Sequence, residues 1–131
     1  MGVLDQVSVG IAGEVVITVT HDMTVQHFMS TMPAVYSTPI MVLHMETAGA
    51  QSIAHLLPPG HVSVGMGINM RHLGASRVGA TIRVTSKLTE KDEKTVLFEV
   101  EAWDGDRKVG DGTHRRGVVN VAAFEKRFGA G

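Results

Sequence analysis

Residues 38–57 read TPIMVLHMETAGAQSIAHLL, and this stretch decides the fold because it predicts one long, largely apolar helix. Thr is a good helix cap, and Pro39 suits the first turn, where its missing N–H leaves no hydrogen bond unmade. The run stops at residues 58–60, Pro-Pro-Gly, so we expect a helix from about Pro39 to Leu57. Its polar side chains share one narrow face: His44, Thr47, Gln51 and His55.

Strand patterns surround this helix. In residues 61–72, HVSVGMGINMRH, apolar residues alternate strictly with polar residues or glycines. This pattern predicts a strand with Gly65 and Gly67 on one face. Turns are expected at 91–93 and 104–106, and the link at 21–37 has no clean periodicity. One apolar helix followed by hairpin-linked strands predicts an α+β fold, with a curved antiparallel sheet wrapped around one long helix in a single domain, 1–131. The remaining strands are expected at residues 14–20, 80–90, 94–103 and 108–121.

The composition narrows the functional class. The chain has 131 residues, 12 Lys and Arg against 13 Asp and Glu, and no cysteine. A near-neutral charge argues against nucleic-acid binding, and the missing cysteines exclude disulfides and thiolate nucleophiles. The sequence shows no basic leader, no apolar run of membrane length and no metal-ligand spacing such as HExxH. We therefore expect a cytoplasmic protein that binds neither nucleic acid nor membrane and uses no metal or organic cofactor.

Three residues could carry chemistry. Glu46 lies roughly 200° around the helix from His44, so it points away from the polar face as either a structural carboxylate or a functional one in a cavity. Thr38 is either a helix cap or a nucleophile, placed where the helix dipole stabilises an oxyanion. By alternation His72 shares the apolar strand face with Met70, as either a core residue or a general base.

Three motifs resemble the fluoroacetyl-CoA thioesterase family of the hotdog superfamily. They are the Thr-to-Glu helix segment at 37–46 (STPIMVLHME), the strand at 64–73 that carries a histidine (VGMGINMRHL), and the late strand at 110–116 (GDGTHRR). Their order and spacing are similar to those of the family over about residues 30–124. The resemblance implies a hotdog fold and hydrolysis of an acyl-CoA thioester.

The resemblance also implies that Thr38, Glu46 and His72 form the catalytic trio. His72 would act as a base on Thr38 or on water, and Glu46 would be nucleophile, base or orienting group. We expect the three to converge within a few ångströms, either with the thioester between them or with a partner subunit supplying one of them.

Further positions are implied for substrate binding. Gly65 corresponds to a backbone N–H donor for the thioester carbonyl, and Arg116 lies close to the active site. Met32 stands where the fluoroacetate enzyme has a Phe in an apolar lid, so a more general pocket for short or medium acyl groups is expected.

The expected partners follow from the fold and the substrate. The substrate is expected to be acyl-CoA, with an acyl carrier protein as the second choice. The alternative function is that of a non-hydrolytic acyl-CoA-binding or hydratase-like hotdog protein. A lone sheet around one helix leaves open edges, so we expect a homodimer or a dimer of dimers.

Overall fold

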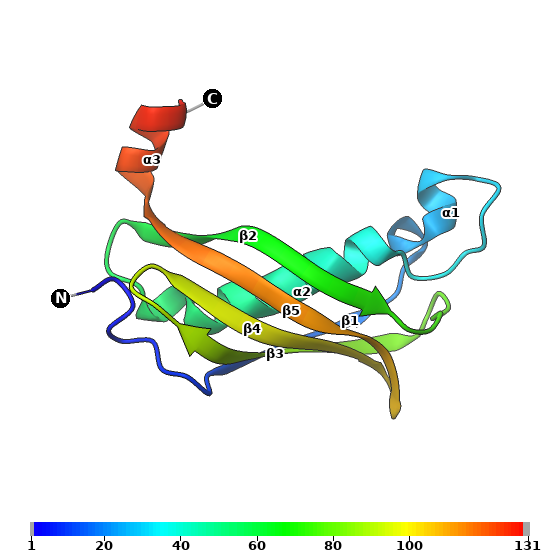
Figure 1. The fold of residues 1–131 in the computed structure, drawn as a ribbon. Coiled ribbons are helices and arrows are strands. Elements are labelled where there is room, and N and C mark those ends of the chain that lie inside the picture. Colours follow the sequence, from blue (N-terminus) through cyan, green and yellow to red (C-terminus); the bar gives the residue numbers. More distant parts are fainter. Residues whose placement is uncertain (1, 130–131) are drawn as a thin grey trace.

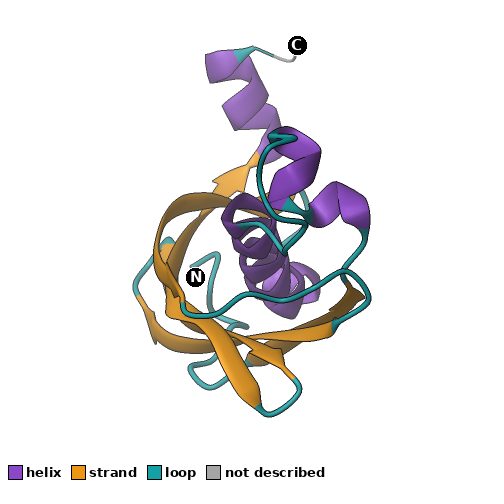
Figure 2. Cartoon of the chain, turned by 90° about the vertical axis from the view of Figure 1, so that its right-hand side faces the viewer, coloured by secondary structure: helices purple, strands orange, loops and turns teal. Residues whose placement is uncertain are grey.

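In the computed structural model, which describes residues 2–129, a five-stranded antiparallel sheet curls around one long helix (Figures 1 and 2). The strands are β1 (Ala12–Thr18), β2 (His61–His72), β3 (Thr81–Lys91), β4 (Thr95–Asp104) and β5 (Arg107–Asn120). The helical elements are η1 (His21–Met23), α1 (Val25–Phe28), α2 (Thr38–Ile53), η2 (Ala54–Leu56) and α3 (Val121–Phe128). The predicted α+β architecture is confirmed.

The sheet has the strand order β1-β3-β4-β5-β2, and all neighbouring strands are antiparallel. β3, β4 and β5 follow one another as hairpins, whereas β2 crosses over to pair with β5. The β4–β5 turn contains Gly105 at φ 64°, a conformation that favours glycine. β1 and β2 are the edge strands, and β2 offers a long row of backbone groups on its outer side.

α2 lies in the concave face of the sheet and supplies much of the core. The sequence predicted a helix to Leu57, but α2 ends at Ile53 and a 3-10 turn continues to Leu56. The predicted cap is also wrong, because Ser37 is the N-cap residue and Thr38 is the first residue inside the helix. The Thr38 hydroxyl is therefore free for another partner. The buried residues of α2 are Met41, Met45, Ala48, Gly49, Ser52 and Ile53.

Two glycines allow α2 to approach the sheet closely. A Cβ at Gly13 in β1 would collide with the carbonyl oxygen of Ala48 and would lie 2.8 Å from the Cβ of Ser52. A Cβ at Gly49 in α2 would lie 3.3 Å from the ring of Phe98, which is fully buried on β4. Helix and sheet are thus in backbone contact at Ala48, and at the adjacent Gly49 the helix packs over an aromatic ring.

β2 contains a β-bulge. Its ladder with β5 shifts between Gly65 and Gly67, so Met66 is the extra residue. A Cβ at Gly65 would collide with the carboxylate of Glu46, whereas a Cβ at Gly67 would meet nothing within 4 Å. The prediction that the two glycines share a face is therefore wrong, because alternation fails at the bulge. Beyond the bulge alternation returns, and His72 is turned inward as predicted.

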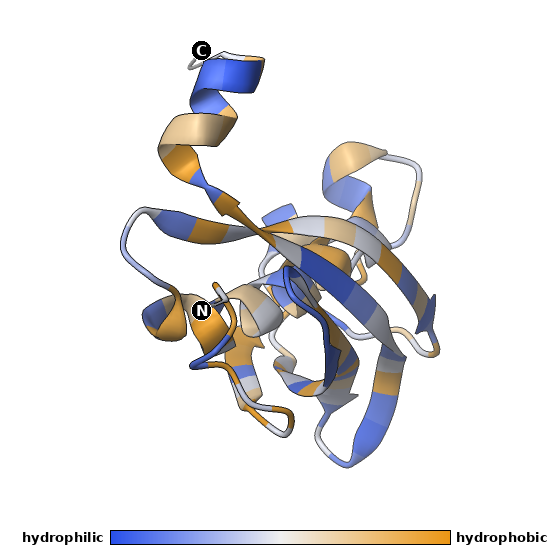
Figure 3. Cartoon of the chain, turned by 60° about the vertical axis from the view of Figure 1, so that its left-hand side comes forward, coloured by the Kyte–Doolittle hydropathy of each residue, from blue (hydrophilic) through white to orange (hydrophobic). Residues whose placement is uncertain are grey.

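The sequence prediction contained no helix after the last strand, yet α3 follows β5 directly. The Asn120 side chain accepts a hydrogen bond from the backbone N–H of Ala123 at 2.9 Å and so caps it. α3 projects away from the sheet on the side of β2 (Figure 1). It is apolar near its start and hydrophilic towards its end (Figure 3).

The N-terminal segment is fixed to the sheet by Lys91. Its ammonium donates to the carbonyl of Leu4 at 3.0 Å and to that of Val7 at 2.6 Å. Both aliphatic side chains are buried. Within residues 2–129, no helix has the length and hydrophobicity that crossing a bilayer requires.

The close packing at Gly13 leads to a stability prediction. Gly13→Ala should lower the free energy of unfolding by about 1–3 kcal/mol, the usual cost of overpacking, because the added methyl displaces α2 from β1. Gly67→Ala is the matched control, since open space surrounds that position, and it should change stability by less than about 0.5 kcal/mol. Urea denaturation at fixed protein concentration measures both. Equal stability of the two variants would contradict the proposed close packing.

Candidate active site

Thr38 and His72 meet at the N-terminal end of α2. Thr38 begins the helix, His72 ends β2, and Thr38 Oγ1 lies 2.7 Å from His72 Nδ1. Burial lowers the pKa of His72, and hydrogen bonding to the backbone of Gly74 opposes that shift. The imidazole is therefore neutral near pH 7, and its Nδ1 can accept the proton of the Thr38 hydroxyl.

Tyr36 supports this pair. Its buried ring meets the His72 ring edge-on, with centroids 6.3 Å apart and planes at 74°. Its hydroxyl lies 2.5 Å from Nδ1 of His44, and the two rings stack. Burial raises the pKa of Tyr36 and lowers the pKa of His44, so the phenol donates to a neutral imidazole. His44, expected on a polar face, is half-buried and holds Tyr36 in place.

A cavity of about 390 Å³ opens beside the Thr38–His72 pair. Its walls are largely apolar, because Val25, Val35, Leu73 and Ala75 contribute to them. Met32, the residue expected in a lid, lies between α1 and α2 with 38% of its surface exposed and does not line this cavity.

Glu46 lies two turns further along α2 and faces β2 and β5, as the helical periodicity predicts. Its Oε1 lies against Gly65 and is 3.8 Å from Nη1 of Arg116. Arg116 is buried and donates from Nε to the hydroxyl of Ser63 and from Nη2 to the Ser63 carbonyl, both at 2.8 Å. Ser63 therefore fixes the guanidinium beside the Glu46 carboxylate.

His114 lies under Glu46, on the same face of β5 as Arg116. Its Nδ1 donates to the carbonyl of Gly67 at 2.8 Å, so Nε2 carries a lone pair and accepts from Arg116 Nη1 at 3.1 Å. Burial lowers the pKa of His114, while the Gly67 carbonyl opposes that shift. His114 is consequently neutral near pH 7, and the nearby positive charge that faces Glu46 belongs to Arg116.

One copy of the chain thus holds two separate groups. Thr38 and His72 form one, and Glu46 with Gly65 and Arg116 forms the other. Thr38 and Glu46 are eight residues apart, about 12 Å along the helix axis. The expected convergence of the trio within a few ångströms is not found in a single chain. Among residues 2–129, no cluster of His, Asp and Glu side chains could hold a metal ion.

Comparison with known proteins identifies the family. The profile of fluoroacetyl-CoA-specific thioesterases matches residues 19–122. The chain belongs to this family. The fluoroacetyl-CoA thioesterase of Streptantibioticus cattleyicolor is 35% identical over 95 residues, which span 72% of this chain and 68% of that one.

Solved structures share the fold. A variant of a fluoroacetyl-CoA-specific thioesterase, in complex with fluoroacetate and CoA, is 32% identical with a TM-score of 0.83, covering 89% of this chain and 98% of that one. A hot-dog-like protein from Thermanaerovibrio acidaminovorans is 25% identical with a TM-score of 0.89, covering 98% and 95%. The hotdog fold predicted from the sequence is confirmed for this member of the fluoroacetyl-CoA-specific thioesterase family.

Three residues around the site were not singled out from the sequence: Tyr36, Ser63 and His114. A usable signal existed for His114, because it lies two residues before Arg116 on a predicted strand, and residues two apart on a strand share a face. No such signal existed for Tyr36 or Ser63. Their contacts with His44 and Arg116 depend on how separate elements pack.

The buried histidines lead to a pH prediction. The pKa values of His44, His72 and His114 are lowered in the folded state, so the unfolded chain binds more protons just below its histidine pKa of about 6.5. The free energy of unfolding should therefore fall as the pH drops from about 7.5 to about 5.5. The depressed carboxyl pKa values of Asp92 and Asp111 act in a lower range, below 3.8.

Urea denaturation across this range, at constant protein concentration, measures the effect. His72→Gln removes one of the three groups and should reduce the slope of stability against pH. A stability that stays level or rises on acidification would contradict the assignment of three neutral buried histidines.

Proposed function

We propose that this thioesterase hydrolyses short or medium acyl-CoA thioesters through Thr38, Glu46 and His72. Membership of a thioesterase family makes it a thioester hydrolase. The observation that carries the site assignment is the contact of 2.7 Å between Thr38 Oγ1 and His72 Nδ1. It pairs a hydroxyl with a neutral base beside an apolar cavity, as acyl transfer or activation of water requires.

The proposed chemistry is a hydrolysis in which each group has a role. The oxygen of Thr38, of Glu46 or of water attacks the thioester carbon, and the C–S bond breaks. An acyl intermediate on Thr38 or Glu46 is then hydrolysed by water, which releases the free acid. His72 takes a proton from Thr38 or from water and returns one to the departing thiolate of coenzyme A. The backbone N–H of Gly65 is the proposed donor to the developing oxyanion, and no side chain at this position obstructs the substrate. These roles require no metal or organic cofactor beyond the coenzyme A of the substrate.

The distance between the two groups favours a site shared by two subunits. β2 is an edge strand, and a two-fold axis across its outer side would pair it antiparallel with its copy. With the axis midway between Gly65 and His72, the His72 end of one β2 lies beside the part of the other that contains Gly65. The Thr38–His72 pair of one subunit then faces the Glu46 of its partner. We therefore propose a homodimer with two composite sites.

The acyl group is proposed to occupy the cavity beside Thr38. Its aliphatic walls suit a short or medium chain, and nothing in them is specific for fluorine.

Substitutions test the catalytic roles directly. Glu46→Gln preserves shape but removes charge and basicity, so it should abolish most turnover. His72→Ala should lower the rate by a factor on the order of 10² or more, the usual scale for a lost general base. Thr38→Ala should also impair turnover, whereas Thr38→Ser retains the hydroxyl and should stay active. Because Thr38 is not the N-cap residue, this pair tests the hydroxyl rather than helix capping.

Thiol release from a panel of short, medium, branched and aromatic acyl-CoAs is the measurement. Circular dichroism of each variant controls for folding. If Glu46→Gln and His72→Ala both hydrolyse acyl-CoA near the parental rate, the proposed site is wrong. If the folded parent binds acyl-CoA but releases no thiol, the binding or hydratase-like function replaces hydrolysis.

Subunit mixing tests the composite site. Light scattering should give a mass of at least twice the 14.0 kDa of the chain. Glu46→Gln and His72→Ala subunits, each nearly inactive alone, should regain about a quarter of parental activity when randomly mixed, because half the dimers then contain one intact site. Mixing after separate denaturation and joint refolding provides the test. Absence of any recovery would place all three residues in one subunit.

A further inference from the structure

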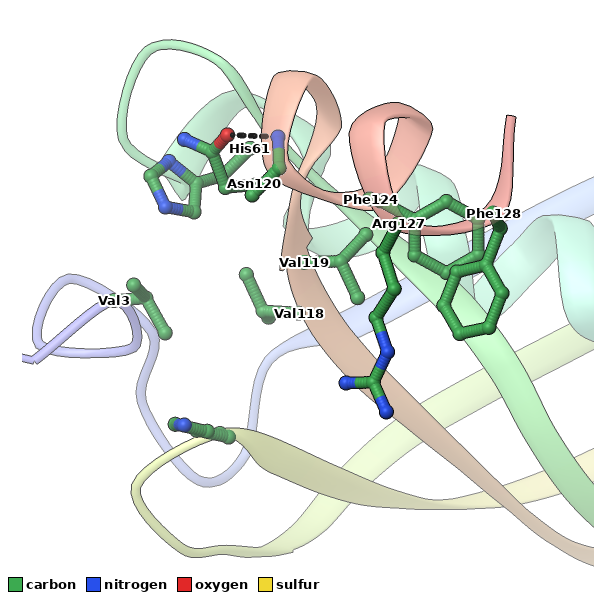
Figure 4. A pocket seen from close by; sticks show the side chains of 10 residues that line it. Val3, His61, Val118, Val119, Asn120, Phe124, Arg127 and Phe128 are labelled. Atoms are coloured by element: carbon green, nitrogen blue, oxygen red, sulfur yellow. Dashed lines mark hydrogen bonds between the residues drawn. The ribbon is translucent and has the colours of Figure 1, made fainter. Parts of the chain in front are cut away.

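A second groove lies at the end of the sheet where β2 and β5 meet α3 (Figure 4). It has a volume of about 500 Å³, and we call it the α3 groove. Its walls come from the N-terminal segment, the β3–β4 turn, the end of β5 and one side of α3. Five of its lining residues are basic or aromatic: His61, Lys94, Phe124, Arg127 and Phe128.

The charge in the α3 groove is entirely basic. Lys94 and Arg127 line it, His61 adds an imidazole, and none of the described lining residues is a carboxylate. Within residues 2–129, neither Lys94 nor Arg127 forms an ion pair. Two cations that line one groove without an ion-pair partner among the described residues favour an anionic ligand with more than one negative group.

The same groove has an aromatic wall. Phe124 and Phe128 lie one helical turn apart with ring centroids separated by 4.8 Å, and 41% and 65% of their surfaces are exposed. The Arg127 guanidinium lies 5.3 Å from the Phe128 ring centroid. Exposed aromatic rings beside a guanidinium bind planar, electron-rich rings by stacking. The ligand favoured by both walls is therefore a phosphorylated compound that contains an aromatic base.

The α3 groove is aligned with the proposed active site. In the β2–β5 ladder Gly65 pairs with Arg116, and His61 pairs with Asn120 at the edge of the groove. The two places are thus four residues apart on the same pair of strands, about 13 Å. An extended pantetheine arm covers that distance, so a thioester at Gly65 and a nucleotide in the α3 groove can belong to one molecule.

We propose that the α3 groove binds the 3′-phosphorylated adenosine diphosphate portion of the coenzyme A thioester. Lys94 and Arg127 bind its phosphates, and Phe124 and Phe128 contact the adenine. This assignment rests on the proposed function for the identity of the substrate. It also makes the enzyme selective for coenzyme A esters over thioesters on an acyl carrier protein, whose phosphopantetheine carries no nucleotide.

Binding of adenosine 3′,5′-bisphosphate, which has no thioester, tests the groove separately from hydrolysis. Calorimetry should detect binding to the parent protein. Lys94→Ala and Arg127→Ala should each weaken it about tenfold, the usual effect of losing a charged hydrogen bond. Lys126→Ala is the matched control, because this exposed neighbour of Arg127 does not line the groove and its loss should leave binding unchanged.

Two substrates complete the experiment. With acyl-CoA, Lys94→Ala and Arg127→Ala should raise KM about tenfold with little change in kcat. With the same acyl group on N-acetylcysteamine, which lacks the nucleotide, both variants should match the parent. These results distinguish the groove from the proposed active site. If the active-site assignment is wrong, Glu46→Gln and His72→Ala will hydrolyse both thioesters at the parental rate.

The proposal is overturned if the parent does not bind the bisphosphate. It is also overturned if Lys94→Ala and Arg127→Ala act no more strongly than Lys126→Ala, or if they impair both thioesters equally. Circular dichroism of the variants confirms that the exposed substitutions leave the fold intact.

Discussion

The packing of α2 into the concave face of the sheet places Thr38 beside His72 and Glu46 beside Arg116. Met41, Met45 and Phe98 are fully buried at this contact, and each such side chain contributes roughly 1.5–3 kcal/mol when removed from water. The close backbone approach at Gly13 fixes the depth of the helix. Because the core fixes α2, the distance between Thr38 and Glu46 does not adjust to the needs of the site. A site that uses both residues must therefore span that distance with substrate or receive one residue from a partner subunit.

The Glu46 group shows how the fold holds a cation inside a small domain. Burying a guanidinium is unfavourable unless its donors are satisfied and a negative charge is near. Ser63 accepts two of the hydrogen bonds of Arg116, the lone pair of a neutral His114 accepts a third, and Glu46 supplies the charge. The Gly67 carbonyl sets the His114 tautomer. Since Gly67 lies just after the bulge, the irregularity of β2 and the ordering of the carboxylate are parts of one arrangement.

The structural features that depend on local periodicity could be predicted from the sequence. The helix at 38–53, the β3–β5 hairpins and the inward orientation of Glu46 and His72 all follow from repeats of 3.6 or 2 residues. The bulge at Met66 did not follow, because an extra residue is defined only by the register with β5. α3 had a signal that was not used, since Asn120 is a good cap and Phe124 and Phe128 are four residues apart. The three proposed catalytic residues do not meet within one chain, because Thr38 and Glu46 lie eight residues apart on one helix. Spacing along a sequence gives no information about residues that a second subunit brings to a site.

The link between β1 and α2 allows the shape of the acyl cavity to change without moving the reacting groups. A bridge of Thr24 with Tyr36 lies within this link, and a bridge of Val35 with Arg77 connects it to the segment before β3. Val25 and Val35 form walls of the cavity beside Thr38. The reacting groups stand on α2, β2 and β5, which the core holds in place. Mutations in the link can therefore reshape the acyl cavity while the helix and sheet beneath it are unchanged. Descendants of one ancestral enzyme could acquire different acyl preferences by drift in this short segment, with the chemistry inherited intact.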